Sequence, residues 1–481
     1  MKRITSLLLM GCLLATPLFL ISCVQGVTDG ERAEPPVEER VTRTEEVGEV
    51  VGEEITREDT EQPPATTPRD TAAPAAITGL VAADAYDGRV NLGWDKSADE
   101  GFDHYNVYIA RAEIKDIAGM TPAHRVNGIT ENIYQVTGLE EGTRYYFAVT
   151  AVDRSGNEPA RVMSVSAVTT PMPRGDADSG LQLDVYKTDR AWAGTTLFSD
   201  ISDSTKPRII EVNMLGEVIW EYLVPRNLVQ YTGGGFDTEW LPNDNILFVL
   251  PRKGVYEVNR RGEVVWSYLT GKISHDADRL PNGNTIFVWG FPDKMEDAQV
   301  VEVNPKGDTV WTWYARDHFS GPRYAGIYDD GFTHTNAVTR LPDGNTLIST
   351  RNFNFVVEVD RKGAVVRTIG EGHIYNQHDP EVLANGNVLC SSFRPHKVVE
   401  IDPGTNRVVW EFLTFPQNQI PNVRDNDRLP NGNTLLCGSA KIAEVTAGGE
   451  IVWQVSRKGL SREEQGTAKG FFKAERVGIR R

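Results

Sequence analysis

The sequence predicts an all-β protein in which a β-sandwich precedes a six-bladed β-propeller closed by its C-terminal strand. The composition favours this class, since 44 glycines, 26 prolines and 9% aromatic residues suit turn-rich β structure better than helical bundles. Residues 76–171 contain short segments of alternating polar and apolar residues separated by turns. From residue 190 onward, a unit of two hairpins repeats six times. The length of 481 residues accordingly accommodates more than one domain.

The N-terminus has the pattern of a targeting segment. Lys2 and Arg3 precede a largely apolar stretch over 4–21, and the stretch ends in Leu-Ile-Ser-Cys23. This pattern resembles a bacterial lipoprotein signal at 1–22, in which cleavage leaves Cys23 as a lipid-bearing N-terminus. The resemblance implies an exported protein anchored to a membrane by acyl chains, at its periplasmic face or at the cell surface. An ordinary secretory signal is the alternative.

Residues 23–75 predict a disordered acidic tether. Between residues 24 and 70 the chain holds 14 Asp/Glu against 5 Arg, and no aromatic residue. Such a stretch cannot bury enough apolar surface to fold, and its charges repel one another. The net charge of -17 argues against nucleic acid as a partner, because binding phosphates requires a basic surface. Beyond the N-terminus no apolar run reaches the length of a membrane span.

Residues 76–171 carry the signature of a sandwich domain. The segment Leu139-Glu-Glu-Gly-Thr-Arg-Tyr145 is followed by the strand-like run YFAVTAVD, and Trp94 lies in an earlier strand-like segment. This arrangement resembles a fibronectin type III domain, with Trp94 as the core tryptophan and Tyr145 as the tyrosine corner. No chemistry is expected of this domain. Residues 172–189 read as a Pro/Gly linker.

The propeller prediction for residues 190–481 rests on two repeating motifs. One is a strand, a turn and a second strand ending in a landmark residue; the landmarks are Trp220, Trp266, Trp311, Arg367, Trp410 and Trp453. Their spacings of 46, 45, 56, 43 and 43 residues fit four strands per blade. The other motif is a hairpin of the type LPNGN. Residues 474–477 match the inner strands of other blades, so the last strand should return to complete the first blade and close the ring.

The first strand of each blade offers one equivalent position near the propeller axis. Counting five residues back from a shared Leu/Val gives Phe236, His275, Asn336, His378, Arg424 and Phe472. His334 lies two residues before Asn336, so three of the eight histidines gather at one mouth of the channel. Such residues can be polar plugs that bond backbone groups. Converging titratable side chains also indicate a site. Three imidazoles could hold zinc, but they span a wide arc, and no metal is expected.

The order of these residues is informative. His275-Asp276, His334-Thr-Asn336, an arginine (Arg351) after the strand TLIST, and Gln377-His378-Asp379 follow one another at fixed places in the repeats. This set resembles that of the bacterial arylsulfate sulfotransferase family, a six-bladed propeller family that moves sulfuryl groups between phenols without a nucleotide sulfate donor. The resemblance implies that His378 is the nucleophile and forms a transient sulfohistidine. His275, His334, Asn336 and Arg351 would bind the sulfuryl oxygens, with aryl sulfates and phenols as substrates and no cofactor.

Other features leave alternatives open. The insertion before His334 contains Tyr324 and Tyr328, and it is either an aromatic lid over an aryl ring or a surface loop. Phe236, Phe472 and Arg424 are candidate substrate-binding residues at the axial register. Cys390 and Cys437 read as buried free thiols rather than a bridge. A non-catalytic surface module that binds a glycan or a protein is the alternative function, because fold does not determine function.

Overall fold

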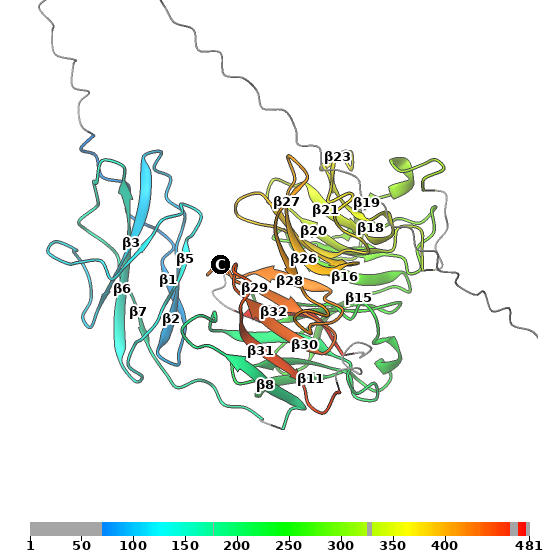
Figure 1. The fold of residues 1–481 in the computed structure, drawn as a ribbon, viewed down its shortest axis with the longest axis horizontal. Coiled ribbons are helices and arrows are strands. Elements are labelled where there is room, and N and C mark those ends of the chain that lie inside the picture. Colours follow the sequence, from blue (N-terminus) through cyan, green and yellow to red (C-terminus); the bar gives the residue numbers. More distant parts are fainter. Residues whose placement is uncertain (1–69, 177, 325–329, 462–469, 478–481) are drawn as a thin grey trace, which may run out of the picture. The chain divides into compact units, whose positions relative to one another are not determined.

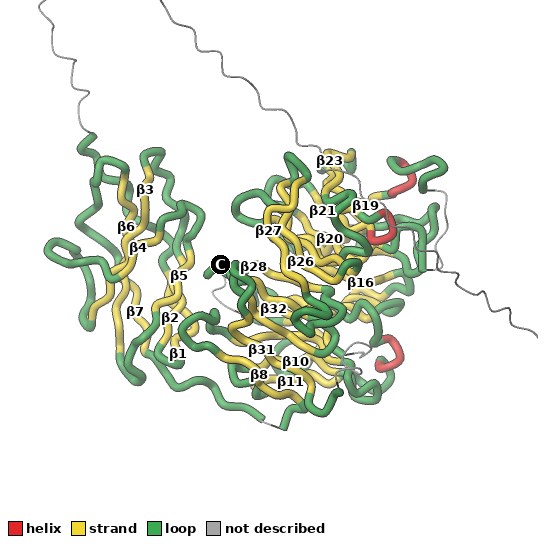
Figure 2. The backbone as a smooth tube through the Cα atoms, viewed as in Figure 1, coloured by secondary structure: helices red, strands yellow, loops and turns green. Residues whose placement is uncertain are grey.

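The computed structural model describes residues 70–481 except 177, 325–329, 462–469 and 478–481. The predicted signal at 1–22 and Cys23 lie outside the described residues. The described chain is built from strands in eight sheets, with three short 3₁₀ helices, η1 (Val229–Tyr231), η2 (Ala315–Asp317) and η3 (Arg351–Phe353) (Figure 2). The all-β prediction is confirmed. Among these described residues, no helix has the length and apolarity to cross a membrane.

The sandwich consists of two antiparallel sheets. One has the order β1 (Val81–Tyr86), β2 (Arg89–Gly93), β5 (Ile133–Val136), and the other the order β4 (His124–Val126), β3 (Phe102–Ala110), β6 (Arg144–Asp153), β7 (Val165–Val168). Trp94 is fully buried between them and meets Tyr105 edge to face at a centroid distance of 5.3 Å. The backbone N–H of Glu140 donates to the Tyr145 hydroxyl at 3.1 Å. Both predicted marker residues thus have their predicted positions.

Six antiparallel sheets follow, each one blade; five have four strands, and the sixth has a fifth strand added (Figure 1). In order from the axis outward they are β32 (Phe471–Val477), β9 (Thr195–Asp200), β10 (Arg208–Val212), β11 (Val218–Leu223); β12 (Thr238–Trp240), β13 (Ile246–Leu250), β14 (Gly254–Val258), β15 (Val264–Leu269); β16 (Ile273–Arg279), β17 (Thr285–Trp289), β18 (Val300–Val303), β19 (Thr309–Trp313); β20 (Thr335–Arg340), β21 (Thr346–Thr350), β22 (Phe355–Val359), β23 (Val365–Ile369); β24 (His378–Val382), β25 (Val388–Phe393), β26 (His396–Asp402), β27 (Arg407–Leu413); and β28 (Asp425–Arg428), β29 (Thr434–Cys437), β30 (Lys441–Val445), β31 (Ile451–Arg457). A fifth strand, β8 (Leu181–Tyr186), pairs with β31.

The repeated motifs hold neighbouring blades together. Each blade carries a mostly buried glutamate in its third strand, and each glutamate binds an arginine. The pairs are Arg260–Glu211, Arg279–Glu257, Arg340–Glu302, Arg367–Glu358, Arg428–Glu400 and Arg476–Glu444. In five of these pairs the guanidinium also lies 4.4 to 5.2 Å from the centroid of a landmark tryptophan. Five of the six pairs join neighbouring blades, whereas Arg367–Glu358 lies within one blade. The repeat therefore encodes contacts between blades as well as strands within them.

The last strand, β32, joins the sheet that begins with the first propeller strand. It pairs antiparallel with β9, with Ala474 opposite Phe198 and Val477 opposite Thr195. Phe471 meets Phe198 edge to face at 4.9 Å. β32 also contacts β12 and β28, the inner strands of the two neighbouring blades. β32 therefore pairs with β9, the strand that the sequence match of residues 474–477 had indicated as its neighbour.

Candidate active site

A cavity of about 260 Å³ lies where the inner strands of the blades begin. It is lined by Gly234, Gly235, Asp237, His275, Asp276, Phe291, His334, Asn336, Arg351, His378, Asp379, Phe393, Arg424, Asp425, Phe472 and Lys473. The five residues predicted to be catalytic, which belong to three different blades, all belong to this lining. They are far apart along the chain, but they meet here because they lie at the same end of successive repeats.

Irregular strand pairing aims these side chains into the cavity. The antiparallel register shifts between Ile273 and Ala277 in β16, and between Thr335 and Val338 in β20. It shifts again between His378 and Glu381 in β24, and in β32 just after Phe471. A β-bulge bends the strand and turns a side chain away from the regular alternation. Successive residues such as His275 and Asp276 can therefore both face the cavity.

His378 has a defined tautomer. Its Nδ1 lies 3.1 Å from the carbonyl oxygen of Asn376, whose backbone has the uncommon φ of 50°. Because a carbonyl oxygen only accepts, Nδ1 carries the proton and Nε2 keeps its lone pair. Burial, with Arg424 and Arg351 nearby, holds the pKa of His378 well below its usual value. The imidazole is therefore neutral near pH 7, as a nitrogen nucleophile must be.

Two further histidines lie side by side. The ring centroids of His275 and His334 are 5.0 Å apart, and Phe291 meets both rings edge to face. The Nδ1 of His275 is bonded to the Ser274 hydroxyl. Burial, followed by the charge of His334, holds the pKa of His275 well below its usual value. Burial and the Arg351 charge lower the pKa of His334 as well, against the opposing effect of Asp330.

Arg351 and Asn336 supply the other donors. Arg351 begins η3, directly after β21, and its Nη1 donates to Asp330 at 2.8 Å. Asn336 donates through Nδ2 to the carbonyl oxygen of Gln377 at 2.9 Å. Its Oδ1 is buried without a hydrogen-bond partner among the described residues. An unsatisfied buried acceptor at the cavity wall is a group that a donor on a bound ligand can satisfy.

The floor of the cavity carries a single ammonium among carboxylates. Lys473 Nζ lies 3.2 Å from Asp276, 3.5 Å from Asp237 and 3.8 Å from Asp379. Burial alone would lower the pKa of Lys473, but these aspartates raise it well above its usual value. Each of the four residues directly follows an axial-register position, so together they form the next layer of side chains in four of the six blades.

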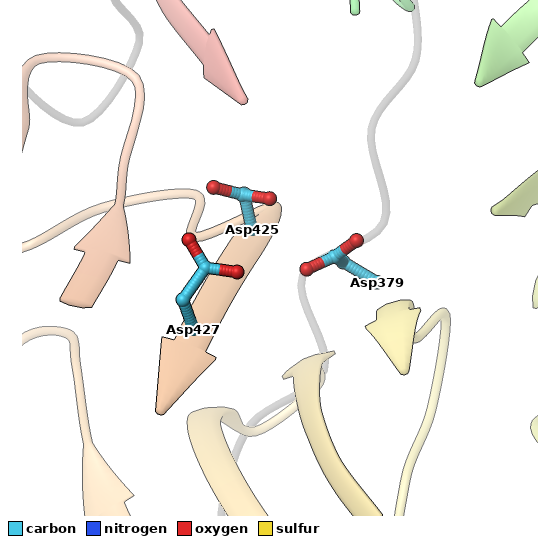
Figure 3. A group of neighbouring side chains, drawn as sticks. All are labelled: Asp379, Asp425 and Asp427. Atoms are coloured by element: carbon cyan, nitrogen blue, oxygen red, sulfur yellow. The ribbon is translucent and has the colours of Figure 1, made fainter. Parts of the chain in front are cut away.

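One group of side chains has the spacing that a metal ion needs. Asp379, Asp425 and Asp427 each offer a carboxylate oxygen, and these oxygens lie within 4.8 Å of one another (Figure 3). Oxygen ligands of this kind suit hard cations such as Ca²⁺. Within the described part of the chain, the three histidines at the cavity do not form such a group.

The substrate-binding predictions have mixed placements. Arg424 and Phe472 line the cavity, with the guanidinium 4.9 Å from the ring centroid. Phe236 is fully buried in an apolar cluster and does not line the cavity. Tyr324 packs on the rings of Phe319 and Phe353, against a hydrophobic cluster shared by two neighbouring blades, rather than over the cavity. Tyr328 lies outside the described residues. Cys390 and Cys437 are buried free thiols, as predicted.

Phe291, Phe393 and Lys473 are among the lining residues that the sequence motifs did not predict. Lys473 was identifiable, because it follows Phe472 in a register that was already defined. Phe291 and Phe393 lie at the C-terminal end of the second strand of their blades: Phe291 follows β17 by two residues, and Phe393 is the last residue of β25. Arg351 comes from the same place in its own blade, so this strand end was a usable signal.

Among curated proteins, two relatives match a short part of this chain. A stretch of 118 residues is 36% identical to chitinase A1 of Niallia circulans, covering 23% of this chain and 14% of that protein. Exoglucanase B of Cellulomonas fimi is 36% identical over 112 residues, covering 23% of this chain and 9% of that protein. The chain therefore spans only a small part of these curated relatives.

Among solved structures, a Bacteroides caccae protein of unknown function has a TM-score of 0.40 at 19% identity, covering 55% of this chain and 93% of that one. Virginiamycin B lyase of Staphylococcus aureus with quinupristin has a TM-score of 0.37 at 13% identity, covering 57% and 87%.

The family models match both folded regions of the chain. Residues 74–166 match the fibronectin type III domain, and residues 187–419 match the arylsulfotransferase (ASST) family. The two resemblances drawn from the sequence motifs are thereby confirmed. The second match begins just ahead of β9 and includes every predicted catalytic residue, from His275 to His378. Residues 187–419 are therefore a domain of the arylsulfotransferase (ASST) family, and a fibronectin type III domain precedes it.

Proposed function

We propose that this protein is an aryl sulfotransferase that moves a sulfuryl group from a phenolic sulfate to a phenolic acceptor through a sulfohistidine at His378. The observation that carries the proposal is the convergence of three histidines, an asparagine and an arginine on one cavity, with the Nε2 of His378 unprotonated. Sulfuryl transfer, like phosphoryl transfer, requires an in-line nucleophile and fixed donors around three equatorial oxygens. The family match of residues 187–419 supports the same reaction class.

In the first half-reaction, Nε2 of His378 attacks the sulfur of the bound ester. The N–S bond forms as the S–O bond to the aryl group breaks, and the electron pair leaves with the phenolate oxygen. The Nδ1 proton stays on the ring, and its hydrogen bond to the Asn376 carbonyl oxygen stabilises the positive charge of the adduct. In the second half-reaction, an acceptor phenol oxygen forms the new S–O bond, the N–S bond breaks, and the phenol proton is released.

The sulfuryl oxygens carry negative charge throughout. Arg351 has a permanently charged planar guanidinium, and His275 and His334 line the same wall. Donors held in place before the reaction stabilise this charge without reorganising, which is worth most in a site that excludes water. Phe291, Phe393 and Phe472 provide apolar ring faces for the aryl group. A cavity of about 260 Å³ suits a small aryl sulfate.

The test is direct. Purified protein is incubated with 4-nitrophenyl sulfate and phenol, and release of 4-nitrophenol is followed by absorbance. We expect release that depends on both compounds and persists in the presence of a chelator. Failure across a panel of aryl sulfates would favour the alternative, a non-catalytic module that binds a glycan or protein.

We further propose that the protein is exported and anchored at the cell envelope through acylation of Cys23. The support is the charged, apolar and Leu-Ile-Ser-Cys sequence of residues 1–23. Metabolic labelling with a fatty-acid analogue should mark the wild-type protein and not Cys23→Ala. Labelling that persists in the variant would contradict the proposal.

A further inference from the structure

We infer that Asp330 is the positioning residue that sets the tautomer of His334 and the direction of the Arg351 guanidinium. Asp330 belongs to the long insertion before β20, whose predicted substrate-binding residues were Tyr324 and Tyr328. The inference rests on the proposed function, because it assigns to Asp330 a part in the transfer reaction. It is also testable without any substrate.

The contacts of the Asp330 carboxylate define its geometry. Oδ2 accepts from Arg351 Nη1 at 2.8 Å and lies 3.1 Å from His334 Nδ1. Oδ1 accepts from Asn352 Nδ2 at 3.1 Å, and the same amide donates to the Gly331 carbonyl at 2.8 Å. One carboxylate thus connects two of the predicted oxygen-binding residues, and Asn352 holds that carboxylate in place.

The backbone around His334 requires such support. His334 has a φ of 47°, a region that non-glycine residues seldom adopt. Its backbone N–H donates to Asp293 Oδ1 at 2.9 Å, and Thr333 donates to Oδ2 of the same aspartate. Asp293 therefore anchors the backbone while Asp330 contacts the imidazole. A strained backbone that is over-determined in this way is typical of functional sites.

The tautomer follows from the chemistry of the partners. The contact is a charge contact at 3.1 Å rather than an aligned hydrogen bond, and a negative carboxylate at this distance favours a proton on Nδ1 of a neutral His334, which leaves the lone pair on Nε2. With Nδ1 facing Asp330, Nε2 is the ring nitrogen left for ligands in the cavity. It can donate to a sulfuryl oxygen only when His334 is protonated, a state that the Asp330 charge and the negative charge of a bound ester both stabilise. Replacing the carboxylate with an amide removes this preference, because an amide NH₂ group can donate to Nδ1 and place the proton on Nε2.

Five charged or titratable groups act on His334. Asp330 and Asp293 raise its pKa, Arg351 lowers it, and His275 and His378 share the cavity wall. Removing the Asp330 charge should therefore lower the titration midpoint of His334 further. It should also release the Arg351 guanidinium from its carboxylate partner, so both oxygen-binding residues lose their orientation together.

The experiment compares the wild type with Asp330→Asn, Asp330→Glu and the control Asp317→Asn. Asp317 lies in the same connection, and among the described residues its side chain pairs with the exposed Arg316 alone, at 3.6 Å. Proton–nitrogen NMR of histidine-labelled full-length protein, assigned with His334→Asn, should show the Nδ1–H tautomer in the wild type. Asp330→Asn should shift His334 toward Nε2–H and lower its titration midpoint. It should also reduce kcat about 100-fold.

The two ideas fail separately. If Asp330→Asn leaves the His334 tautomer, its midpoint and kcat at wild-type values, the inference about Asp330 is wrong. If the tautomer changes as expected while the wild type transfers no sulfuryl group from any aryl sulfate, the positioning role stands and the proposed function falls. Asp330→Glu should restore the tautomer and part of kcat; a melting temperature equal to the wild type in both variants excludes misfolding. Asp317→Asn should match the wild type in every measurement.

Discussion

The Nδ1 atom of His378 lies 3.1 Å from the carbonyl oxygen of Asn376, two residues earlier in the chain. This contact turns Nε2 toward the cavity and keeps it unprotonated, because the carbonyl can only accept. Asn376 has a positive φ, and a register shift in β24 follows His378. The local backbone is therefore shaped to present one nitrogen of this ring.

The first prediction concerns His378→Asn. Asparagine is close in size and the site is only partly buried, so the melting temperature should change little. Turnover should fall by about 10⁴-fold or more, as for the loss of a covalent nucleophile. With donor alone, mass spectrometry should find an acid-labile sulfuryl adduct on the wild type and none on the variant. An adduct on any other residue would remove His378 from this role.

The second prediction concerns Gly235→Ala. Gly235 has a φ of +90°, and a Cβ there would lie 2.8 Å from the Cα of His275. The backbone of β16 must shift, so stability should fall by about 1–3 kcal/mol and transfer activity should fall with it. Gly233→Ala is the matched control, since its Cβ would meet nothing within 4 Å. Equal melting temperatures for the two variants would contradict the predicted clash.

The third prediction concerns blade four, where Arg367 occupies the landmark tryptophan position. Arg367 Nε donates to Glu358 at 2.7 Å, whereas Arg340 from the next blade reaches the equivalent Glu302 at 2.8 Å and stacks on Trp311. The position equivalent to Arg340 is Val382, so Arg367 compensates from within its own blade. Arg367→Trp removes the arginine partner of Glu358, which keeps its hydrogen bond from Asn345. Because Arg367 is 42% exposed, we expect a loss of only about 1–2 kcal/mol.

Adding Val382→Arg to Arg367→Trp should recover that stability, because it recreates the pair seen between Arg340 and Glu302. Denaturant unfolding of the two single variants and the double variant measures the coupling energy. Additive losses, with no recovery in the double variant, would show that Arg367 does not compensate for Val382.

The fourth prediction concerns the pH dependence of stability. Burial, with Asp276 nearby, raises the pKa of Asp278 to about 8, and burial, with Asp379 nearby, raises the pKa of Glu381 to about 7. The folded state thus binds more protons than the unfolded chain, so stability should rise as the pH falls from about 8 to 6.5. Below about 6.5 the neutral His275 and His378 oppose this trend, because the unfolded chain then binds protons that these rings do not.

Thermal melting between pH 6 and 9 tests this dependence. Asp278→Asn should flatten the slope above pH 6.5, since the amide has no proton to gain. A slope that is unchanged in this variant would contradict the assignment of the effect to Asp278.

Much of the site was predictable because aligning the repeats identifies equivalent positions near the propeller axis. Once the shared Leu/Val of the inner strands is aligned, His275, His378 and Arg424 fall at one position, and the cavity lining contains them all. The same alignment wrongly predicted that Phe236 binds substrate, because Phe236 lies at the equivalent position but packs into an apolar cluster. An equivalent position in the aligned repeats predicts how far along the propeller axis a residue lies. The local path of the backbone decides whether its side chain points into the cavity. Phe236 and Arg424 both lie just before a regularly paired strand, β12 and β28, yet only Arg424 lines the cavity.

The sequence by itself determined the strand pattern, the number of blades, the marker residues of the sandwich and the residue types gathered at the axis. These follow from periodicity, which is a local property of the chain. The tertiary structure alone decided that Asp330 would reach His334 and Arg351, that Lys473 would lie among three aspartates, and that Tyr324 would pack into a blade core. The reason is physical: such contacts depend on loop paths and on blades distant in sequence, which no repeat period encodes.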